Sequence, residues 1–265
     1  MSYSDQDFDI SGFVPGAAAF ADIWEAEASE FRAREAAIGR ARLNVPYGPG
    51  NRQALDLFHP SGKARGLTVF VHGGYWHKFH RNFWSHYAQG LTEANFAVAM
   101  PSYTLAPEAR IHQMAREIAA AVETAAGLVA GPISITGHSA GGHLSARMAC
   151  RDAALSEVTR ARITKITPIS PLVDLRPLKL ITMNDILGLD EDETVSESPV
   201  LHPRPDVPVT VWVGAEERPV FLDQAKALSQ HWAAEYRIAP GCNHFDILDG
   251  LRTADTALVR SIIES

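Results

Sequence analysis

The sequence has few cysteines, no long apolar run and no excess of basic residues, and these absences exclude several classes of protein. Its two cysteines are Cys150 and Cys242, so a disulfide-rich secreted fold is excluded and a reducing compartment is permitted. A transmembrane helix needs about 18 consecutive apolar residues, and no such stretch occurs. Residues 1–16 carry three aspartates and lack the apolar core of a secretory signal. We therefore expect a cytoplasmic protein that does not contact a membrane.

The charge balance is acidic, with 31 acidic and 24 basic residues and a formal net charge of -7. Lys and Arg are not gathered into the basic patch that a nucleic-acid surface requires, so no nucleic-acid partner is expected. The 265 residues are 46% hydrophobic, which is enough for one large core. Because no repeat, low-complexity tract or long linker divides the chain, we predict a single domain over residues 1–265.

Short apolar runs alternate with longer segments of helical periodicity, which is typical of βαβ units. The runs at 67–72 and 96–100 are nearly continuous, as expected for strands buried on both faces of a sheet. The expected strands are 53–58, 67–72, 96–100, 133–136, 163–169, 207–213 and 236–239, and the expected helices are 17–40, 111–122, 141–151, 219–232 and 254–262. This order predicts an α/β fold with a mostly parallel central sheet and helices on both faces.

Residues 172–208 interrupt this alternation. The segment is long, rich in proline and partly acidic. Long connections in compact domains usually lie on the surface and carry function. We therefore expect a cap-like insertion that lies over the ends of the strands.

The strongest local motif is Gly137-His138-Ser139-Ala140-Gly141, which matches G-x-S-x-G between an expected strand and an expected helix. A very tight strand-to-helix turn forces the serine into an unfavourable backbone conformation, and side chains two residues away on either side would collide. The turn raises the hydroxyl above the sheet and directs the helix N-terminus at the reacting centre. The motif predicts that Ser139 is a nucleophile.

A second glycine motif, at residues 72–76 (HGGYW), directly follows the expected strand 67–72. In acyl transfer the carbonyl oxygen becomes anionic and needs preorganised N–H donors, which glycines allow to approach closely. We expect an oxyanion hole made by the backbone N–H groups of Gly74 and Tyr75 from this loop and of Ala140 from the serine motif. Which of the two upstream groups contributes more stays open.

The same loop is expected to contact the substrate through Gly73, Tyr75 and Trp76. A short acyl group needs little space, whereas an aryl group needs an apolar wall. Further aromatic residues that could supply this wall follow the loop at Phe79, Phe83 and Trp84.

The expected general base is His244, which lies just after the last expected strand. In this class of hydrolase the triad follows the chain order serine, acid, histidine. The acid should therefore leave the strand 207–213, where Glu216 and Glu217 both lie in the loop and Asp223 lies farther along, inside the next helix. Spacing alone does not separate Glu216 from Glu217.

The region around the second glycine motif is rich in histidine, at positions 72, 77, 80 and 86, which raises the question of a metal site. No aspartate, glutamate or cysteine is interleaved between these residues. We therefore expect structural or substrate-lining roles for them, and neither a metal nor another cofactor.

These motifs resemble those of the kynurenine formamidase, or arylformamidase, branch of the α/β-hydrolase superfamily. The branch's H-G-G-x-W loop corresponds to residues 72–76, and its G-x-S-A-G-G-H motif to residues 137–143. Further matches run from about Leu55 to His244, including L-D-L-F at 55–58, D-L-R-P-L at 174–178 and S-P at 198–199. The resemblance implies an α/β-hydrolase fold. Its acid-loop pattern aligns with residues 213–224 and implies that the acid is Glu217, where the branch usually has aspartate.

The resemblance also implies a reaction: hydrolysis of the formyl group of an N-formyl arylamine such as N-formylkynurenine, through an acyl-serine intermediate. A general short-chain carboxylesterase is the alternative, because hormone-sensitive-lipase-like esterases share the H-G-G motif and a segment like residues 103–108. A ligand-binding protein on the same scaffold is a third possibility, but such relatives usually lose a triad member. The expected partner is a small acyl substrate, and a homodimer is compatible with the sequence.

Overall fold

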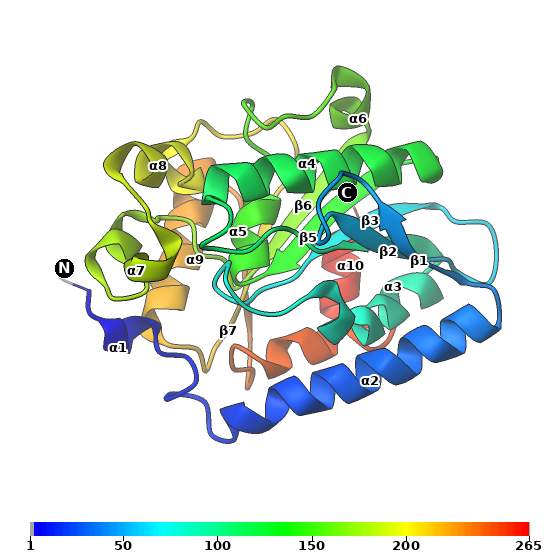
Figure 1. Ribbon diagram of the computed structural model, residues 1–265, viewed down its shortest axis with the longest axis horizontal. Coiled ribbons are helices and arrows are strands. Elements are labelled where there is room, and N and C mark those ends of the chain that lie inside the picture. The colour runs from blue at the N-terminus through cyan, green and yellow to red at the C-terminus, as the bar shows by residue number, and fades with distance from the viewer. Residues whose placement is uncertain (1–2, 265) are drawn as a thin grey trace.

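The computed structural model describes residues 3–264 and is built around one eight-stranded sheet (Figure 1). The strand order is β1-β2-β4-β3-β5-β6-β7-β8. The pairings of β1 with β2 and of β2 with β4 are antiparallel, and all the others, from β4–β3 to β7–β8, are parallel. The strands are β1 (Ala41–Pro46), β2 (Ala54–Phe58), β3 (Gly66–Val71), β4 (Phe96–Pro101), β5 (Ile133–His138), β6 (Ile163–Ile169), β7 (Thr210–Gly214) and β8 (Glu235–Ala239). The expectation of a mostly parallel sheet is confirmed.

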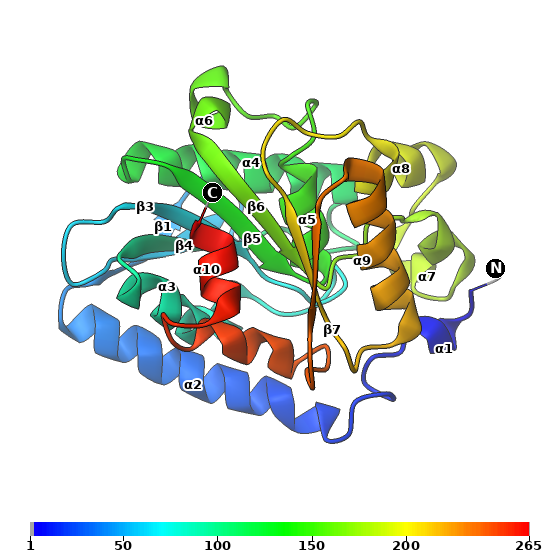
Figure 2. The same ribbon diagram turned by 180° about the vertical axis from the view of Figure 1, so that it is seen from behind.

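Helices cover both faces of the sheet, as both views show (Figures 1 and 2). One face carries α4 (Ile111–Leu128), α5 (Ala140–Arg147) and α9 (Pro219–Trp232), and the other carries α2 (Ala17–Ala37), α3 (Gln89–Glu93) and α10 (Ala257–Ile263). The shorter helices are α1 (Asp5–Phe8), α6 (Glu157–Arg162), α7 (Asn184–Leu187), α8 (Glu191–Ser196), η1 (Arg81–Phe83), η2 (Ser85–Ala88), η3 (Arg176–Leu180), η4 (Pro199–Leu201) and η5 (Asp246–Leu251).

The sheet separates two hydrophobic cores, because successive side chains of a strand point to opposite faces. In β3, Val69 and Val71 pack with the α4–α5–α9 layer, whereas Phe70 packs with the α2–α3–α10 layer. All three side chains are fully buried. This double burial explains why the central strands are nearly continuous apolar runs in the sequence.

Strand β1 was not predicted from the sequence. It is an edge strand whose backbone pairs only with β2, and most of its side chains are exposed or half-buried. Its register shifts between Arg42 and Val45, and Asn44 lies in this irregular stretch with a positive φ of 58°. An exposed, irregular edge strand lacks the alternation of apolar and polar residues on which a sequence prediction depends.

The predicted insertion, residues 172–208, contains η3, α7, α8 and η4 rather than an open loop. It is fixed to the α/β core by a buried ion pair to α5 and by a second pair in which the arginine is exposed. Arg147 of α5 donates through Nε to Glu197 at 2.9 Å, and Arg110, just before α4, donates through Nε to Glu193 at 2.7 Å. Only a part of this insertion reaches the candidate site.

No helix within residues 3–264 combines the length and the apolar character that crossing a membrane requires.

Four loops that leave the carboxyl ends of parallel strands hold the residues of interest. Strand β3 leads into residues 72–76, β5 into Ser139, β7 into Glu217 and β8 into His244. Parallel strands end at the same edge of a sheet, so the fold brings these four loops together there.

Candidate active site

Ser139 occupies a strained turn between β5 and α5. Its backbone has φ 57° and ψ -118°, which is unusual for a residue with a side chain. A Cβ atom on Gly137 would lie 2.3 Å from the carbonyl oxygen of Gly141, and one on Gly141 would lie 2.0 Å from that of Val71. Glycine is therefore required at both positions, as the motif predicted. The turn presents Ser139 at the N-terminus of α5.

His244 and Glu217 form a buried pair. Nδ1 of His244 donates to Oε2 of Glu217 at 2.6 Å, and both side chains are almost completely shielded from solvent. The other oxygen, Oε1, accepts from the backbone N–H of Gly214 at 2.8 Å and from the hydroxyl of Ser170. The carboxylate is thus held on both sides. Its neighbour Glu216 is exposed, so the structure separates the two glutamates that spacing left equivalent.

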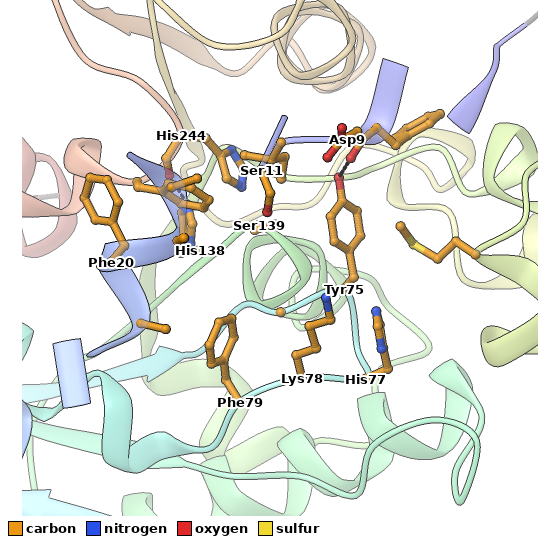
Figure 3. Close-up of a pocket in the computed structure, with 18 of the residues that line it drawn as sticks. Asp9, Ser11, Phe20, Tyr75, His77, Lys78, Phe79, His138, Ser139 and His244 are labelled. Carbon is orange, nitrogen blue, oxygen red and sulfur yellow. Dashed lines mark hydrogen bonds between the residues drawn. The ribbon is translucent and has the colours of Figure 1, made fainter. Parts of the chain in front are cut away.

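Ser139 and His244 line the same pocket (Figure 3). Because Nδ1 of His244 is directed at Glu217, Nε2 is the ring nitrogen available to a partner in this pocket. Within residues 3–264 the Ser139 hydroxyl forms no hydrogen bond, so the expected bond to His244 is not made in this state. In unliganded active sites such bonds are often long and shorten when substrate binds.

The loop after β3 has an unusual backbone, with positive φ values of 115° at Gly74, 47° at Tyr75 and 57° at Trp76. It packs directly on the serine turn, since a Cβ atom on Gly73 would lie 3.1 Å from Cβ of Ser139. The backbone N–H groups of Gly74 and Tyr75 have no acceptor in the described part of the chain. Unpaired amide donors beside a serine are the groups that an oxyanion hole requires.

Ala140 contributes the same kind of donor from the other side. It is the first residue of α5, and its N–H has no acceptor among residues 3–264. The first N–H groups of a helix lack partners inside the helix and carry its partial positive charge. The three expected oxyanion donors therefore belong to two loops that touch each other.

The pocket has a volume of about 540 Å³ and extends from Ser139 over residues 72–76, which we call the oxyanion loop (Figure 3). Part of its wall comes from the insertion, through residues 181–183 and Ile186. The other residues of the insertion do not line the pocket. A larger part comes from residues 5–24, which the sequence did not associate with the site.

We call residues 5–11 the N-terminal arm. Four hydrogen bonds fix it. The hydroxyl of Tyr75 donates to the carbonyl of Phe8 at 2.7 Å, and Arg218 Nε donates to the carbonyl of Asp9 at 2.6 Å. Thr182 donates to Asp5 through its backbone N–H at 2.8 Å and through Oγ1 at 2.6 Å. In both views α1, within the arm, lies beside α7 of the insertion (Figures 1 and 2). The arm therefore connects the oxyanion loop, the insertion and α9.

The arm had one signal in the sequence that could have revealed it. Phe8 and Ile10 are isolated apolar residues in a polar, acidic segment, and both are buried. Apolar residues without helical or strand periodicity predict a packed segment only if the surface they pack on is known. Here that surface is formed by distant parts of the chain and exists only in the folded protein.

The pocket has an aromatic wall built from several elements. Phe79 and Trp84 line it, as expected from the sequence. They are joined by Phe20, Trp24 and Phe245, with ring centroids 5.0 Å apart for Phe20 and Phe245 and 4.6 Å apart for Trp24 and Trp84. Phe83 packs on Phe79 at 5.2 Å but does not line the pocket.

Two of the three expected substrate contacts are corrected by the structure. Trp76 is fully buried and does not line the pocket; its positive φ turns the side chain into the core, where its ring lies 5.2 Å from that of His143. Gly73 also lies behind the pocket surface, against the serine turn. Tyr75 alone of the three lines the pocket.

Exposed charged side chains form a part of the pocket lining. Lys78 and Asp9 both line it (Figure 3). Among residues 3–264 Lys78 has no ion-pair partner, whereas one oxygen of Asp9 accepts the N–H of Gly12 at 3.0 Å. The pocket therefore combines an apolar wall with an ammonium group and a carboxylate.

The four histidines in and after the oxyanion loop do not gather as metal ligands within residues 3–264. His72 instead donates through Nδ1 to the carbonyl of Gly73 at 2.8 Å and stacks on Tyr103. Burial, partly opposed by that hydrogen bond, lowers the pKa of His72 to about 3. Its ring is therefore neutral and supports the oxyanion loop.

A different group, Cys150, Asp152 and His202, has potential ligand atoms within 4.8 Å of one another. Arg147 occupies the same place, with Nη1 3.1 Å from Asp152 and 3.3 Å from His202. A fixed guanidinium charge opposes the binding of a cation. We therefore assign this group to the ion-pair network that holds the insertion.

The fold and this arrangement define the class of protein. Residues 68–238 match the model of the family described as alpha/beta hydrolase fold, and the chain belongs to that family. It is similar to kynurenine formamidase from Salmo salar, with 26% identity over 249 residues that cover 87% of this chain and 84% of the relative. Kynurenine formamidase from Drosophila melanogaster is 27% identical over 239 residues, covering 82% of this chain and 79% of the relative. The chain is thus a kynurenine formamidase-like α/β-hydrolase enzyme.

Solved structures agree with this fold. A candidate thioesterase from Silicibacter sp. TM1040 is 46% identical, with 97% of each chain covered and a TM-score of 0.94. Esterase B from Lactobacillus rhamnosis is 19% identical, with 92% of each chain covered and a TM-score of 0.69, which is evidence for the shared fold alone.

Proposed function

We propose that this hydrolase removes the formyl group of an N-formyl arylamine such as N-formylkynurenine, with Ser139 as nucleophile, His244 as general base and Glu217 as the acid that orients it. The observation that carries the proposal is the buried 2.6 Å pair of His244 and Glu217 beside a strained serine in one pocket. The similarity of the chain to proteins named kynurenine formamidase supports a formamide substrate.

In the proposed mechanism Nε2 of His244 takes the proton of Ser139 while Oγ attacks the formyl carbon. The oxyanion is held by the N–H groups of Gly74, Tyr75 and Ala140, each worth about 3 kcal/mol in comparable sites. His244 then gives the proton to the departing arylamine nitrogen, and the C–N bond breaks. Water, deprotonated by His244, then attacks the formyl carbon; the bond from this carbon to Oγ of Ser139 breaks, His244 returns the proton to Oγ, and formate leaves.

The imidazolium formed in both steps is stabilised by Glu217. Its carboxylate holds Nδ1 of the ring, which fixes the tautomer and leaves Nε2 as the atom that exchanges the proton. The hydrogen bonds from Gly214 and Ser170 keep the carboxylate in place. The carboxylate itself need not be protonated in this scheme.

The composition of the pocket supports an aromatic substrate with charged ends. Phe20, Trp24 and Phe79 offer an apolar wall to an aryl ring, which prefers offset or edge-to-face contacts with other rings. Beside its ring, N-formylkynurenine carries a carboxylate and an ammonium group. Lys78 and Asp9 have the complementary charges and line the same pocket.

A second candidate is the hydrolysis of a short-chain ester or thioester. The 46% identity with a candidate thioesterase favours it, and so does the chemistry, because the same groups cleave activated esters. A third candidate is a non-catalytic binding protein, in which Ser139 would be unreactive.

A panel of paired substrates tests these readings: N-formylkynurenine, the uncharged formanilide, p-nitrophenyl acetate and acetyl-CoA. We expect kcat/KM to be highest for N-formylkynurenine, and Ser139→Ala to lower it about 10⁶-fold for every substrate that is turned over. Turnover of esters or thioesters without any turnover of formamides would replace the formamidase proposal by the second candidate. Failure of a fluorophosphonate probe to label Ser139 would point to a binding protein.

A further inference from the structure

His138, the residue before the candidate nucleophile, is a buried side chain that the mechanism above does not use. It ends β5, is 2% exposed and lines the pocket next to His244 (Figure 3). Nε2 of its ring lies 2.8 Å from the backbone carbonyl oxygen of His244, and the two ring centroids are 4.5 Å apart. It therefore contacts the base by both its ring and its hydrogen bond.

The hydrogen-bond partners of the His138 ring determine which of its two nitrogens carries the hydrogen. A carbonyl oxygen only accepts hydrogen bonds, so Nε2 of His138 carries the hydrogen. Nδ1 is then a lone-pair acceptor, and it has no partner among residues 3–264. Burial, with a further contribution from His244, lowers the pKa of His138 well below its ordinary value. The ring is therefore neutral and held in one tautomer.

The other hydrogen bonds of the loop that carries His244 lie within the loop, as between the N–H of Asn243 and Asp246 at 2.7 Å, or run to the loop after β7. The loop follows the edge strand β8 and turns at Gly241, where φ is 69°. The N–H of Glu216 donates to the carbonyl of Cys242 at 2.9 Å, and Glu217 binds the imidazole itself. Among residues 3–264 the bond from His138 to the carbonyl of His244 is the hydrogen bond that joins this loop to the serine turn.

His138 also touches the oxyanion loop. A Cβ atom on Gly73 would lie 3.2 Å from Nδ1 of His138 and 2.8 Å from its carbonyl oxygen. His138 thus precedes the candidate nucleophile in the chain and binds the loop after β8 that carries His244. It also packs against residues 72–76, the loop of the oxyanion donors. Displacements of about 1 Å at such a place can cost about 100-fold in rate.

We propose that His138 is a positioning residue: its Nε2–H group holds the backbone of His244 so that the imidazole stays beside Ser139 in the pocket and can reach the serine hydroxyl when substrate binds. The inference rests on the proposed role of His244 as general base. A neutral ring suits the task, because His244 gains a positive charge in each step and a charged neighbour 4.5 Å away would oppose it.

Three variants separate this role from simple packing. In His138→Gln the amide nitrogen reaches about as far as Nε2 of histidine and can still donate to the carbonyl of His244. In His138→Asn the amide is polar but ends near the position of Nδ1, short of that carbonyl. In His138→Phe the ring is kept and the donor is lost. Gln and Asn form the matched pair, and their comparison remains informative if the Phe variant does not fold.

The readouts are kcat and KM for p-nitrophenyl acetate and the rate at which a fluorophosphonate labels Ser139. We expect His138→Asn and His138→Phe to lose about 10- to 100-fold in kcat and in labelling rate, with KM changed less than about twofold, and His138→Gln to recover most of both rates. Equal rates in the Gln and Asn variants, or wild-type rates in the Phe variant, would overturn the proposal.

The outcome is distinguishable from a failure of the proposed function. If the wild-type protein is not labelled at Ser139, the mechanism itself is wrong. If it is labelled but does not hydrolyse formamides, only the substrate assignment is wrong, and the comparison of the His138 variants still stands. Thermal unfolding of each variant, monitored by circular dichroism, identifies any loss of rate that follows from loss of folded protein, and such a loss shared by Gln and Asn also counts against the proposal.

Discussion

The carboxylate of Glu217 lies 2.6 Å from Nδ1 of His244, whereas the adjacent Glu216 is exposed to solvent. We expect Glu217→Gln to lower kcat about 10³-fold, because the amide can neither hold the same tautomer nor stabilise the imidazolium. Glu216→Gln is the matched control and should leave kcat within about twofold. Steady-state kinetics on one substrate checks both variants, and a larger loss in Glu216→Gln would transfer the role of acid to that residue.

The unpaired ammonium of Lys78 leads to a prediction about binding. Lys78→Met should raise KM about tenfold, or ~1.4 kcal/mol, for a substrate with a carboxylate, and leave kcat nearly unchanged since the side chain does not touch the reacting atoms. The neutral formanilide should show no such change. Lys226→Met, an exposed lysine of α9 outside the pocket, is the control variant. An equal rise in KM for charged and neutral substrates would mean that Lys78 does not recognise charge.

The bond between Tyr75 and the carbonyl of Phe8 can be removed with little change of shape. We expect Tyr75→Phe to destabilise the protein by about 1 kcal/mol, since the partly buried carbonyl loses one of its two donors and keeps only the N–H of Ile10. The arm should also be cleaved faster by proteases near residues 5–11. Urea unfolding and limited proteolysis measure the two effects. If neither changes, the hydroxyl does not hold the arm.

The buried histidines predict how stability depends on pH. Burial lowers the pKa of His72 and of His143 from 6.5 to about 3 in the folded state. Between these two values the unfolded chain binds a proton at each site and the native protein does not, so the free energy of unfolding falls as the pH falls. Each such histidine contributes about 1.4 kcal/mol per pH unit in that window.

Urea unfolding between pH 7 and pH 4 measures this slope. In His143→Gln the amide can still donate to the carbonyl of Glu197, which accepts from His143 at 2.6 Å in the wild type, but no longer titrates. The variant should therefore show a shallower loss of stability below pH 6.5 than the wild type. Equal slopes in the two proteins would mean that His143 does not stay neutral in the fold.

Much of the architecture could be predicted because its causes are local. The strand at 163–169 and the helix at 219–232 have the same bounds in the sequence prediction and in the structure. In both elements the spacing of the apolar residues follows directly from burial in or against the sheet. The glycines around Ser139 are equally local, because the atoms they would meet lie within the turn or on the neighbouring strand.

Other features depended on contacts between distant parts of the chain. Trp76 was expected in the pocket because it follows the oxyanion glycines, but its backbone turns the side chain into the core. The N-terminal arm reaches the pocket through bonds to residues 67 to 209 positions away. No pattern within residues 5–11 predicts which distant residues these hydrogen bonds reach.

The sequence by itself determined the sheet, the serine turn and the set of residues from which an acid and a base could be drawn, since these follow from the steric and hydrophobic properties of neighbouring residues. Only the tertiary structure decided that Glu217 rather than Glu216 faces His244, that the arm forms a wall of the pocket, and that His138 joins the base loop to the serine turn. The physical reason is that hydrogen-bond partners are chosen by distance in space, and segments far apart in the chain meet only after the sheet has formed.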